Sequence, residues 1–159
     1  MSDQVSEANG LISIEQRVRA SFALQGLMTL LGATLIDVKP GLVVIRLPFR
    51  QELTQQNGFF HAGATSAIAD SAGGYAGLSV FPENSGVLTV EYKINLLAPA
   101  QGDYLEAVGS VIRSGRTLTV CQLEVFAVRG DERTVIAVGQ QTLICLRPNL
   151  EARGQATPR

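Results

Sequence analysis

The spacing of apolar residues divides the first part of the chain into one helical and two strand-like segments. Residues 11–31 carry apolar side chains at intervals of four or five, which predicts an amphipathic helix packed on the outside of the fold, with Ser13 as its N-cap. These positions are Ile14, Val18, Phe22, Leu27 and Leu31. Strand-like runs follow at residues 33–39 and 42–49, and the Pro-Gly pair between them predicts a hairpin turn.

The second half of the chain has the pattern of an antiparallel sheet. From Leu88 the sequence LTVEYKINL alternates strictly between apolar and polar residues, which predicts a half-buried strand. Three longer strands are predicted at about residues 103–113, 117–129 and 134–147. The intervening segments 114–116 and 130–133 are short enough for antiparallel hairpins.

Between these two regions lies a segment of unusually small residues. Residues 62–77 contain six alanines and four glycines among sixteen positions, and the segment is apolar nearly all round. A helix of this kind must be enclosed, and its small side chains let a sheet approach closely. We therefore predict an α+β fold in which one curved antiparallel sheet wraps around a central helix.

Length and composition indicate one ordinary globular domain. The chain has 159 residues, of which 46% are hydrophobic and 17% are charged. We expect the domain to span residues 11–147, with flexible polar ends at 1–10 and 148–159. A net charge of −1 gives no broad electropositive face, so neither nucleic acid nor an anionic membrane is an expected partner.

Several common chemistries have no matching motif. The single histidine and the absence of Cys-x-x-Cys or His-Glu-x-x-His spacing argue against a metal site, and no P-loop, dinucleotide fingerprint or Gly-x-Ser-x-Gly elbow predicts another cofactor or nucleophile. Cys121 and Cys145 fall in predicted strands and are expected to be free buried thiols. With no apolar span and no signal-peptide pattern, we expect a soluble cytoplasmic protein.

One carboxylate stands out in the central helix. Asp70 is surrounded in sequence by alanine, glycine, serine and isoleucine. Aspartate has poor propensity for helix interiors and is rarely buried without a partner. The structural explanation is a wet patch or a partner arginine, and the functional explanation is a carboxylate placed for chemistry. We favour the functional explanation.

The start of the same helix offers a second chemical feature. His61, Ala62 and Gly63 carry backbone N–H groups that lack intrahelical acceptors, and the helix dipole adds positive potential there. Such a terminus suits a carbonyl oxygen that becomes negative during acyl transfer. Ala62 and Asp70 are eight positions apart, about 12 Å along one helix, so both can act on one bond only if they come from two chains.

The motifs that carry these features resemble a known family. Q-x-N-G-F-F-H-A-G, the aspartate in A-D-S-A-G-G, then T-V-E-Y-K-I-N-L-L-A-P-A and S-G-R-T resemble the hotdog-fold acyl-CoA thioesterases of the phenylacetate-pathway type over about residues 20–147. The resemblance implies a long central helix wrapped by a curved antiparallel sheet. It also implies homodimers joined edge to edge, often paired into tetramers, with catalytic residues shared between subunits.

Residue by residue, the resemblance assigns catalytic roles. Asp70 matches the catalytic carboxylate, and the amide of Ala62 matches the oxyanion donor, although the family's usual H-G-G is H-A-G here. Gln55 matches a residue that orients the carbonyl or the water, with Gln56 and Asn57 as alternatives. Thr89 matches a hydroxyl that positions water in some relatives, and it can equally be an ordinary strand threonine.

Other residues are candidates for substrate binding. The loop Arg113-Ser114-Gly115-Arg116-Thr117 resembles the family's loop that faces the phosphates of coenzyme A; otherwise it is a solvated hairpin tip. Asn57, His61 and Gly63 flank the predicted oxyanion donor. His61 is expected to cap the helix or to pack rather than to transfer a proton, and Asn57 with Gly58 can simply form a turn.

The expected activity is therefore hydrolysis of an acyl-CoA thioester to a free acid and coenzyme A. Phe59, Phe60 and Tyr75 are expected to line a crevice between subunits that holds the acyl chain. Asp70 acts as nucleophile or general base in this scheme. The alternatives are a hotdog hydratase or dehydratase, which would have to use His61, and a non-catalytic module that binds acyl-CoA.

Overall fold

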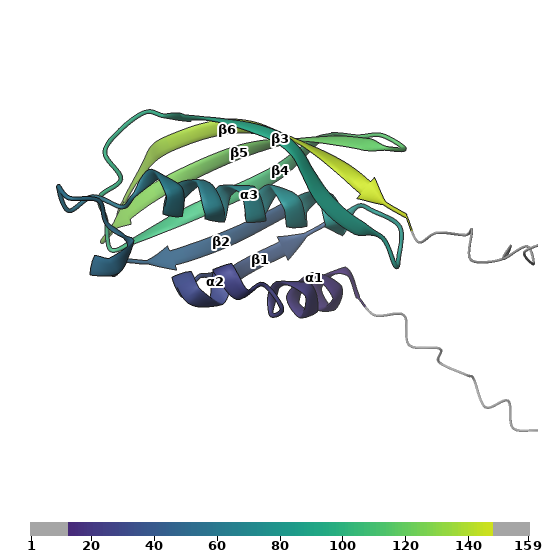
Figure 1. Ribbon diagram of the computed structural model, residues 1–159, viewed down its shortest axis with the longest axis horizontal. Coiled ribbons are helices and arrows are strands. Elements are labelled where there is room, and N and C mark those ends of the chain that lie inside the picture. The colour runs from purple at the N-terminus through teal and green to yellow at the C-terminus, as the bar shows by residue number, and fades with distance from the viewer. Residues whose placement is uncertain (1–12, 148–159) are drawn as a thin grey trace, which may run out of the picture.

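A computed structural model describes residues 13–147 and shows six antiparallel strands curved around one long helix (Figure 1). The strand order in the sheet is β1-β2-β4-β5-β6-β3. The strands are β1 (Thr34–Lys39), β2 (Leu42–Pro48), β3 (Gly86–Leu96), β4 (Tyr104–Ser114), β5 (Leu118–Arg129) and β6 (Glu132–Leu146). The helix α3 (Ala62–Ser79) lies across the concave face, so the predicted α+β hotdog architecture is confirmed.

The register of the sheet explains how α3 is held. The β1–β2, β4–β5 and β5–β6 pairs are hairpins, whereas β2 pairs with β4 and β3 pairs with β6 across the sheet. The α3 segment connects β2 to β3, so the chain crosses the concave face between the two outer parts of the sheet. The strand β3 is at one edge, and a bulge between Thr89 and Glu91 interrupts its pairing with β6.

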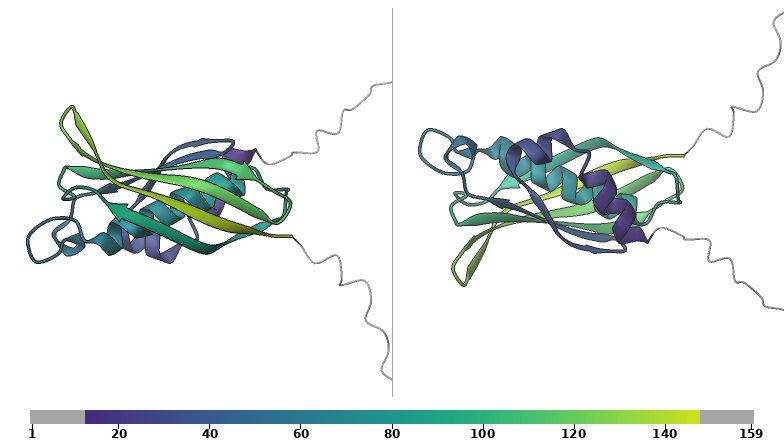
Figure 2. Two further views of the ribbon diagram at one scale, coloured as in Figure 1. Left: turned by 90° about the horizontal axis from the view of Figure 1, so that it is seen from above. Right: turned by 90° about the horizontal axis from the view of Figure 1, so that it is seen from below.

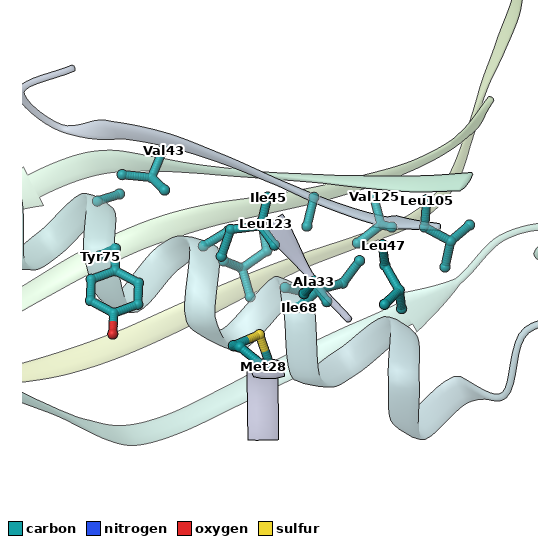
Figure 3. Close-up of a cluster of buried hydrophobic side chains, with 14 of the residues drawn as sticks. Met28, Ala33, Val43, Ile45, Leu47, Ile68, Tyr75, Leu105, Leu123 and Val125 are labelled. Carbon is teal, nitrogen blue, oxygen red and sulfur yellow. The ribbon is translucent and has the colours of Figure 1, made fainter. Parts of the chain in front are cut away.

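Small residues let the sheet touch the backbone of α3. Gly109 on β4 lies so close that an added Cβ would be 2.3 Å from the carbonyl carbon of Ala72 and 2.4 Å from the nitrogen of Gly73. The core between helix and sheet is aliphatic, with Ile68, Ile45 and Leu123 fully buried (Figure 3). The predicted close packing of a small-residue helix is therefore confirmed.

The prediction of one helix over residues 11–31 is wrong. The structure has two short helices, α1 (Ile14–Phe22) and α2 (Gly26–Leu31), and Gln25 between them has an extended backbone. Ser13 does cap α1, in a capping box with Gln16. The break rotates α2, so that Met28 points toward α3 while Leu27, predicted to be inward, is 53% exposed (Figure 3). Both short helices lie beside α3 rather than against the convex face of the sheet (Figure 2).

The structure also corrects the description of β3. Its alternation predicts a half-buried strand, yet most of its side chains are exposed on both faces in the single chain. The reason is its position at the sheet edge, where it has a neighbour on one side only. A short 3₁₀ helix, η1 (Gln51–Leu53), precedes α3.

The predicted flexible ends, 1–10 and 148–159, lie outside the described residues. Within the part of the chain that the structure describes, no helix is long and apolar enough to cross a membrane.

Candidate active site

Asp70 lies in the third turn of α3, half-buried and facing the first residues of β3. The hydroxyl of Thr89 donates a 2.7 Å hydrogen bond to its Oδ1 atom. The amide Nε2 of Gln141 donates to the same oxygen at 2.5 Å and also lies 3.1 Å from the backbone oxygen of Asp70. One carboxylate oxygen is therefore held by two donors, and Oδ2 has no protein donor among the described residues.

Gln141 was not predicted from the sequence. It lies on β6 with no exposed surface, and its Nε2 is also 3.0 Å from the hydroxyl oxygen of Thr89. Because the amide donates to that hydroxyl, the single proton of Thr89 is directed to Asp70. The sequence of β6 does contain a partial indication. Successive side chains of a strand point to opposite faces, so one of the neighbours Gln140 and Gln141 must face inward. Gln141 is the one that shares its face with the buried Leu143.

A cavity of about 690 Å³ opens beside Asp70. Its walls come from α3, from the start of β3, and from α1 together with the link that follows it, Leu24 and Gln25, here called the α1–α2 segment. Tyr75 lines it, with its hydroxyl 3.4 Å from that of Ser21. Phe59 and Phe60, predicted to line the same crevice as Tyr75, line a different cavity in the single chain. Burial raises the pKa of the Tyr75 phenol above its ordinary value, so the group is neutral at physiological pH.

At the start of α3 the predicted donor is available. His61 is the N-cap, and its Nδ1 accepts a 2.8 Å hydrogen bond from the backbone N–H of Gly63. The structure therefore shows His61 in a capping position, and it also shows that the N–H of Gly63 is occupied. Within residues 13–147 the N–H of Ala62 has no acceptor, and it lies at the positive end of the helix.

A second cavity, of about 300 Å³, lies beside Ala62. Gln55 and Phe59 line it together with the end of β3. Gln55 accepts a hydrogen bond from the backbone of Asn57 through its side-chain oxygen, and Gly58 has a φ of 82° and donates to the carbonyl of Gln55. Asn57 and Gly58 thus form a turn that holds Gln55 near Ala62.

The loop predicted to bind phosphate is a hairpin tip between β4 and β5. All five of its residues, 113–117, are exposed. Arg116 and Thr117 line a cavity of about 280 Å³ together with Cys145 and Arg147. The sequence analysis did not single out Arg147, which adds a second guanidinium beside Arg116.

Both cysteines are free thiols in the structure. Cys121 is a buried free thiol under α3, and burial raises its pKa to about 11, so it is not a thiolate near neutral pH. Cys145 is also free and is half-buried. No group of three or more potential metal ligands occurs among the residues that the structure describes.

The candidate residues thus form two groups in one chain. Asp70 and Thr89 meet at the start of β3, whereas Ala62 and Gln55 meet beside its end. Thr89 and Leu96 are seven residues apart, about 23 Å along a strand. A single chain therefore brings each half of the predicted site together but keeps the two halves apart.

Gln141→Leu is expected to lower the kcat of the expected thioester hydrolysis by about 10- to 100-fold. The substitution removes a hydrogen bond to the Asp70 carboxylate, and hydrogen bonds to a charged group contribute about 1.5–3 kcal/mol. KM should change little, because Gln141 has no exposed surface with which to contact a substrate. Gln140→Leu, on the exposed face of the same strand, is the matched control. Steady-state kinetics decide the matter: an unchanged kcat in Gln141→Leu would mean that this amide does not position Asp70.

Known proteins share both this sequence and this fold. Residues 57–134 match the model of the thioesterase superfamily. The chain is 32% identical over 123 residues to a provisionally named esterase of Halobacterium salinarum, an alignment that covers 72% of this chain and 81% of that one. A crystal structure of a thioesterase family protein from Silicibacter pomeroyi matches with a TM-score of 0.84 at 43% identity, covering 86% of this chain and 100% of that one.

The fold is also that of the E. coli PaaI protein from the phenylacetic acid degradation operon. That match has a TM-score of 0.77 at 20% identity and covers 86% of this chain and 97% of that one. The sequence match, the esterase relative and the 43% identical thioesterase structure confirm the resemblance to hotdog-fold thioesterases. The chain belongs to the thioesterase superfamily, has its hotdog fold, and is a thioester hydrolase.

Proposed function

We propose that the protein hydrolyses acyl-CoA thioesters at active sites shared between two subunits. The observation that carries this proposal is the Asp70 carboxylate, which has one oxygen fixed by Thr89 and Gln141 and lies beside a cavity of about 690 Å³. Clefts of 300–1,000 Å³ are typical of small-molecule sites. The free oxygen Oδ2 is then the reactive atom.

In this mechanism the thioester carbonyl accepts a hydrogen bond from the N–H of Ala62. Oδ2 of Asp70 either attacks the carbonyl carbon or takes a proton from the water that attacks it. Negative charge develops on the carbonyl oxygen, where the N–H and the helix dipole stabilise it. The C–S bond then breaks, and the thiolate of coenzyme A leaves and takes up a proton. If water attacked, the acyl group leaves directly as a free acid. If Asp70 attacked, the acyl group is left as a mixed anhydride with Asp70, and water hydrolyses that anhydride to the free acid and the original carboxylate.

The exposed edge strand β3 supports the proposal of a second subunit. It carries large apolar side chains that are exposed in the single chain, and its outer edge has no strand partner. These exposed side chains are Leu88, Val90, Tyr92 and Leu96, followed by Leu97. A second copy that pairs its β3 antiparallel to this one would bury them and continue the sheet.

The same pairing would assemble the active site. Asp70 lies beside Thr89 near the start of β3, and Ala62 shares a cavity with Leu96 at its end. In an antiparallel pair related by a two-fold axis, the start of one β3 faces the end of the other. Each dimer would then contain two complete sites, each with Asp70 from one chain and Ala62 from its partner. Two such dimers could further associate into a tetramer.

The cavity beside the β4–β5 hairpin supports the proposal that the substrate is a coenzyme A ester. Arg116 and Arg147 both line it, and guanidinium groups are well suited to bind phosphate. The proposed ligand groups are the phosphates of the nucleotide end. The hydroxyl of Ser114 contacts that of Thr119 at 3.0 Å, so its proposed role is to shape the loop.

Release of free thiol from a panel of acyl-CoA esters tests this function. We expect turnover of acyl-CoA and a raised KM for a truncated thioester that lacks the nucleotide. Binding of acyl-CoA without thiol release would instead identify a non-catalytic module. Hydration of an enoyl-CoA, followed by its ultraviolet absorbance, would identify a hydratase, for which His61 is poorly placed because its Nδ1 is engaged with Gly63.

A further inference from the structure

The cavity beside Asp70 is elongated along α3. Asp70, Gly74 and Leu78 all line it, and residues spaced by four lie on one face of a helix. From Asp70 to Leu78 the helix rises about 12 Å. The opposite wall comes from the α1–α2 segment and the first residues of β3, so the cavity is a channel that leads away from the carboxylate.

Gly74 leaves the middle of this channel open. A Cβ built at Gly74 would meet nothing within 4 Å apart from its chain neighbours and the backbone of its own helix. The neighbouring glycines differ, because a Cβ would be 2.0 Å from the Oε1 of Gln141 at Gly73 and 2.3 Å from a methyl of Leu143 at Gly77. Close contact with the sheet therefore explains why positions 73 and 77 are glycine, but it does not explain the glycine at position 74. Glycine is also less favourable than alanine inside a helix.

The walls of the channel suit an uncharged group. Apolar side chains line it from three elements, with a neutral polar band where the hydroxyls of Ser21 and Tyr75 meet. The apolar residues are Leu24, Leu78, Val87 and Leu88. Arg17 lies at the far end, and its Nη1 and Nη2 atoms already donate to the carbonyl of Leu78 in the last turn of α3 and to those of Phe81 and Pro82 just after it.

We propose that Gly74 determines the acyl-chain specificity by keeping this channel open. The channel accepts an extended, uncharged acyl group that starts at the thioester beside Asp70 and passes Gly74 toward Leu78. Acetyl and other very short groups do not reach that far and gain nothing from it. This inference rests on the proposed acyl-CoA hydrolysis and adds the class of acyl group.

Gly74→Leu tests the proposal, with octanoyl-CoA and acetyl-CoA as substrates. The wild-type protein should have the higher kcat/KM for octanoyl-CoA. The variant should lose at least about tenfold in kcat/KM for octanoyl-CoA, because pocket contacts of this size discriminate by 10- to 200-fold, while acetyl-CoA changes less than about twofold. Gly74→Ala should fall between the two proteins, and retained acetyl-CoA hydrolysis shows that the leucine variant is folded.

An equal loss for both substrates, or none for either, would overturn the role of Gly74. If the wild-type protein hydrolyses no ester of the acyl-CoA panel, the proposed function fails, and the channel is then tested by binding alone. Hydrolysis of other acyl-CoA esters but not of octanoyl-CoA would overturn the channel and leave the proposed function standing. The binding test is isothermal titration of octanoyl-CoA and of free coenzyme A into the wild-type protein and into Gly74→Leu. If the channel holds the acyl group, the wild-type protein should bind octanoyl-CoA more tightly than free coenzyme A, and Gly74→Leu should lose that difference. Equal affinities of the wild-type protein for the two ligands would refute the channel.

Discussion

Asp70→Asn is expected to lower kcat for thioester hydrolysis by about 10²–10⁴-fold, the usual contribution of a positioned acid-base group. Asparagine keeps an oxygen that can accept the hydrogen bonds from Thr89 and Gln141, so the local structure should persist. It replaces the free Oδ2 with an amide nitrogen, which can neither attack the carbonyl carbon nor accept a proton from water. The loss should therefore appear in kcat and leave the melting temperature close to that of the wild-type protein.

The matched control for this variant is Asp131→Asn. Asp131 is an exposed carboxylate in the β5–β6 turn, outside both cavities that contain the candidate catalytic residues. Its variant should hydrolyse acyl-CoA at the wild-type rate. If Asp70→Asn also retained normal turnover, the reaction would have to use another nucleophile or base, and the proposed mechanism would be wrong.

Gly109→Ala is expected to be the most damaging substitution for stability, with a loss of about 3 kcal/mol or more, at the upper end of overpacking effects. The added Cβ would lie 2.3–2.4 Å from backbone atoms of Ala72 and Gly73. No rotamer change relieves a contact with backbone, so α3 or β4 must move. Urea unfolding measures the difference in the free energy of unfolding, and soluble expression reports an outright failure to fold.

Gly74→Ala is the matched glycine substitution in the contacting helix. Its Cβ meets nothing within 4 Å, so the higher helix propensity of alanine should stabilise the protein by about 1 kcal/mol. The two substitutions add the same methyl group and should change stability in opposite directions. Equal effects would contradict the close contact between α3 and β4.

The architecture was predictable because its signals are local. Strict alternation identifies strands, short polar links identify hairpins, and a run of alanine and glycine identifies a helix that is enclosed at close range. The helix break at Gln25 was missed because apolar spacing alone does not separate one helix from two. The interval of five between Phe22 and Leu27, with Gly26 inside it, was the available sign.

The candidate site was predictable only in part. Asp70 was recognisable because a carboxylate among small apolar residues needs an explanation, and Ala62 because it begins the helix. Gln141 comes from a strand 71 positions later in the chain than Asp70, and its contact depends on the β3–β6 register, which one sequence does not reveal. The channel past Gly74 depends on where the α1–α2 segment lies, and this too is a tertiary feature.

The central claim is that each active site takes Asp70 from one subunit and the amide of Ala62 from the other. Ala62→Pro is the variant that isolates the second group, because proline removes the N–H yet is well tolerated at the first position of a helix. His61, which precedes it, has the extended backbone that a following proline requires. Loss of one oxyanion donor should lower kcat by about 10²–10³-fold.

Mixing two inactive proteins, Asp70→Asn and Ala62→Pro, is the most direct test. If the site is shared, a mixed dimer contains one doubly defective site and one intact site. After unfolding and refolding at equal concentrations, half of the dimers are mixed, so hydrolysis should recover to about a quarter of the wild-type rate. If each chain forms its own site, the refolded mixture stays as inactive as its components, and the shared-site account is contradicted.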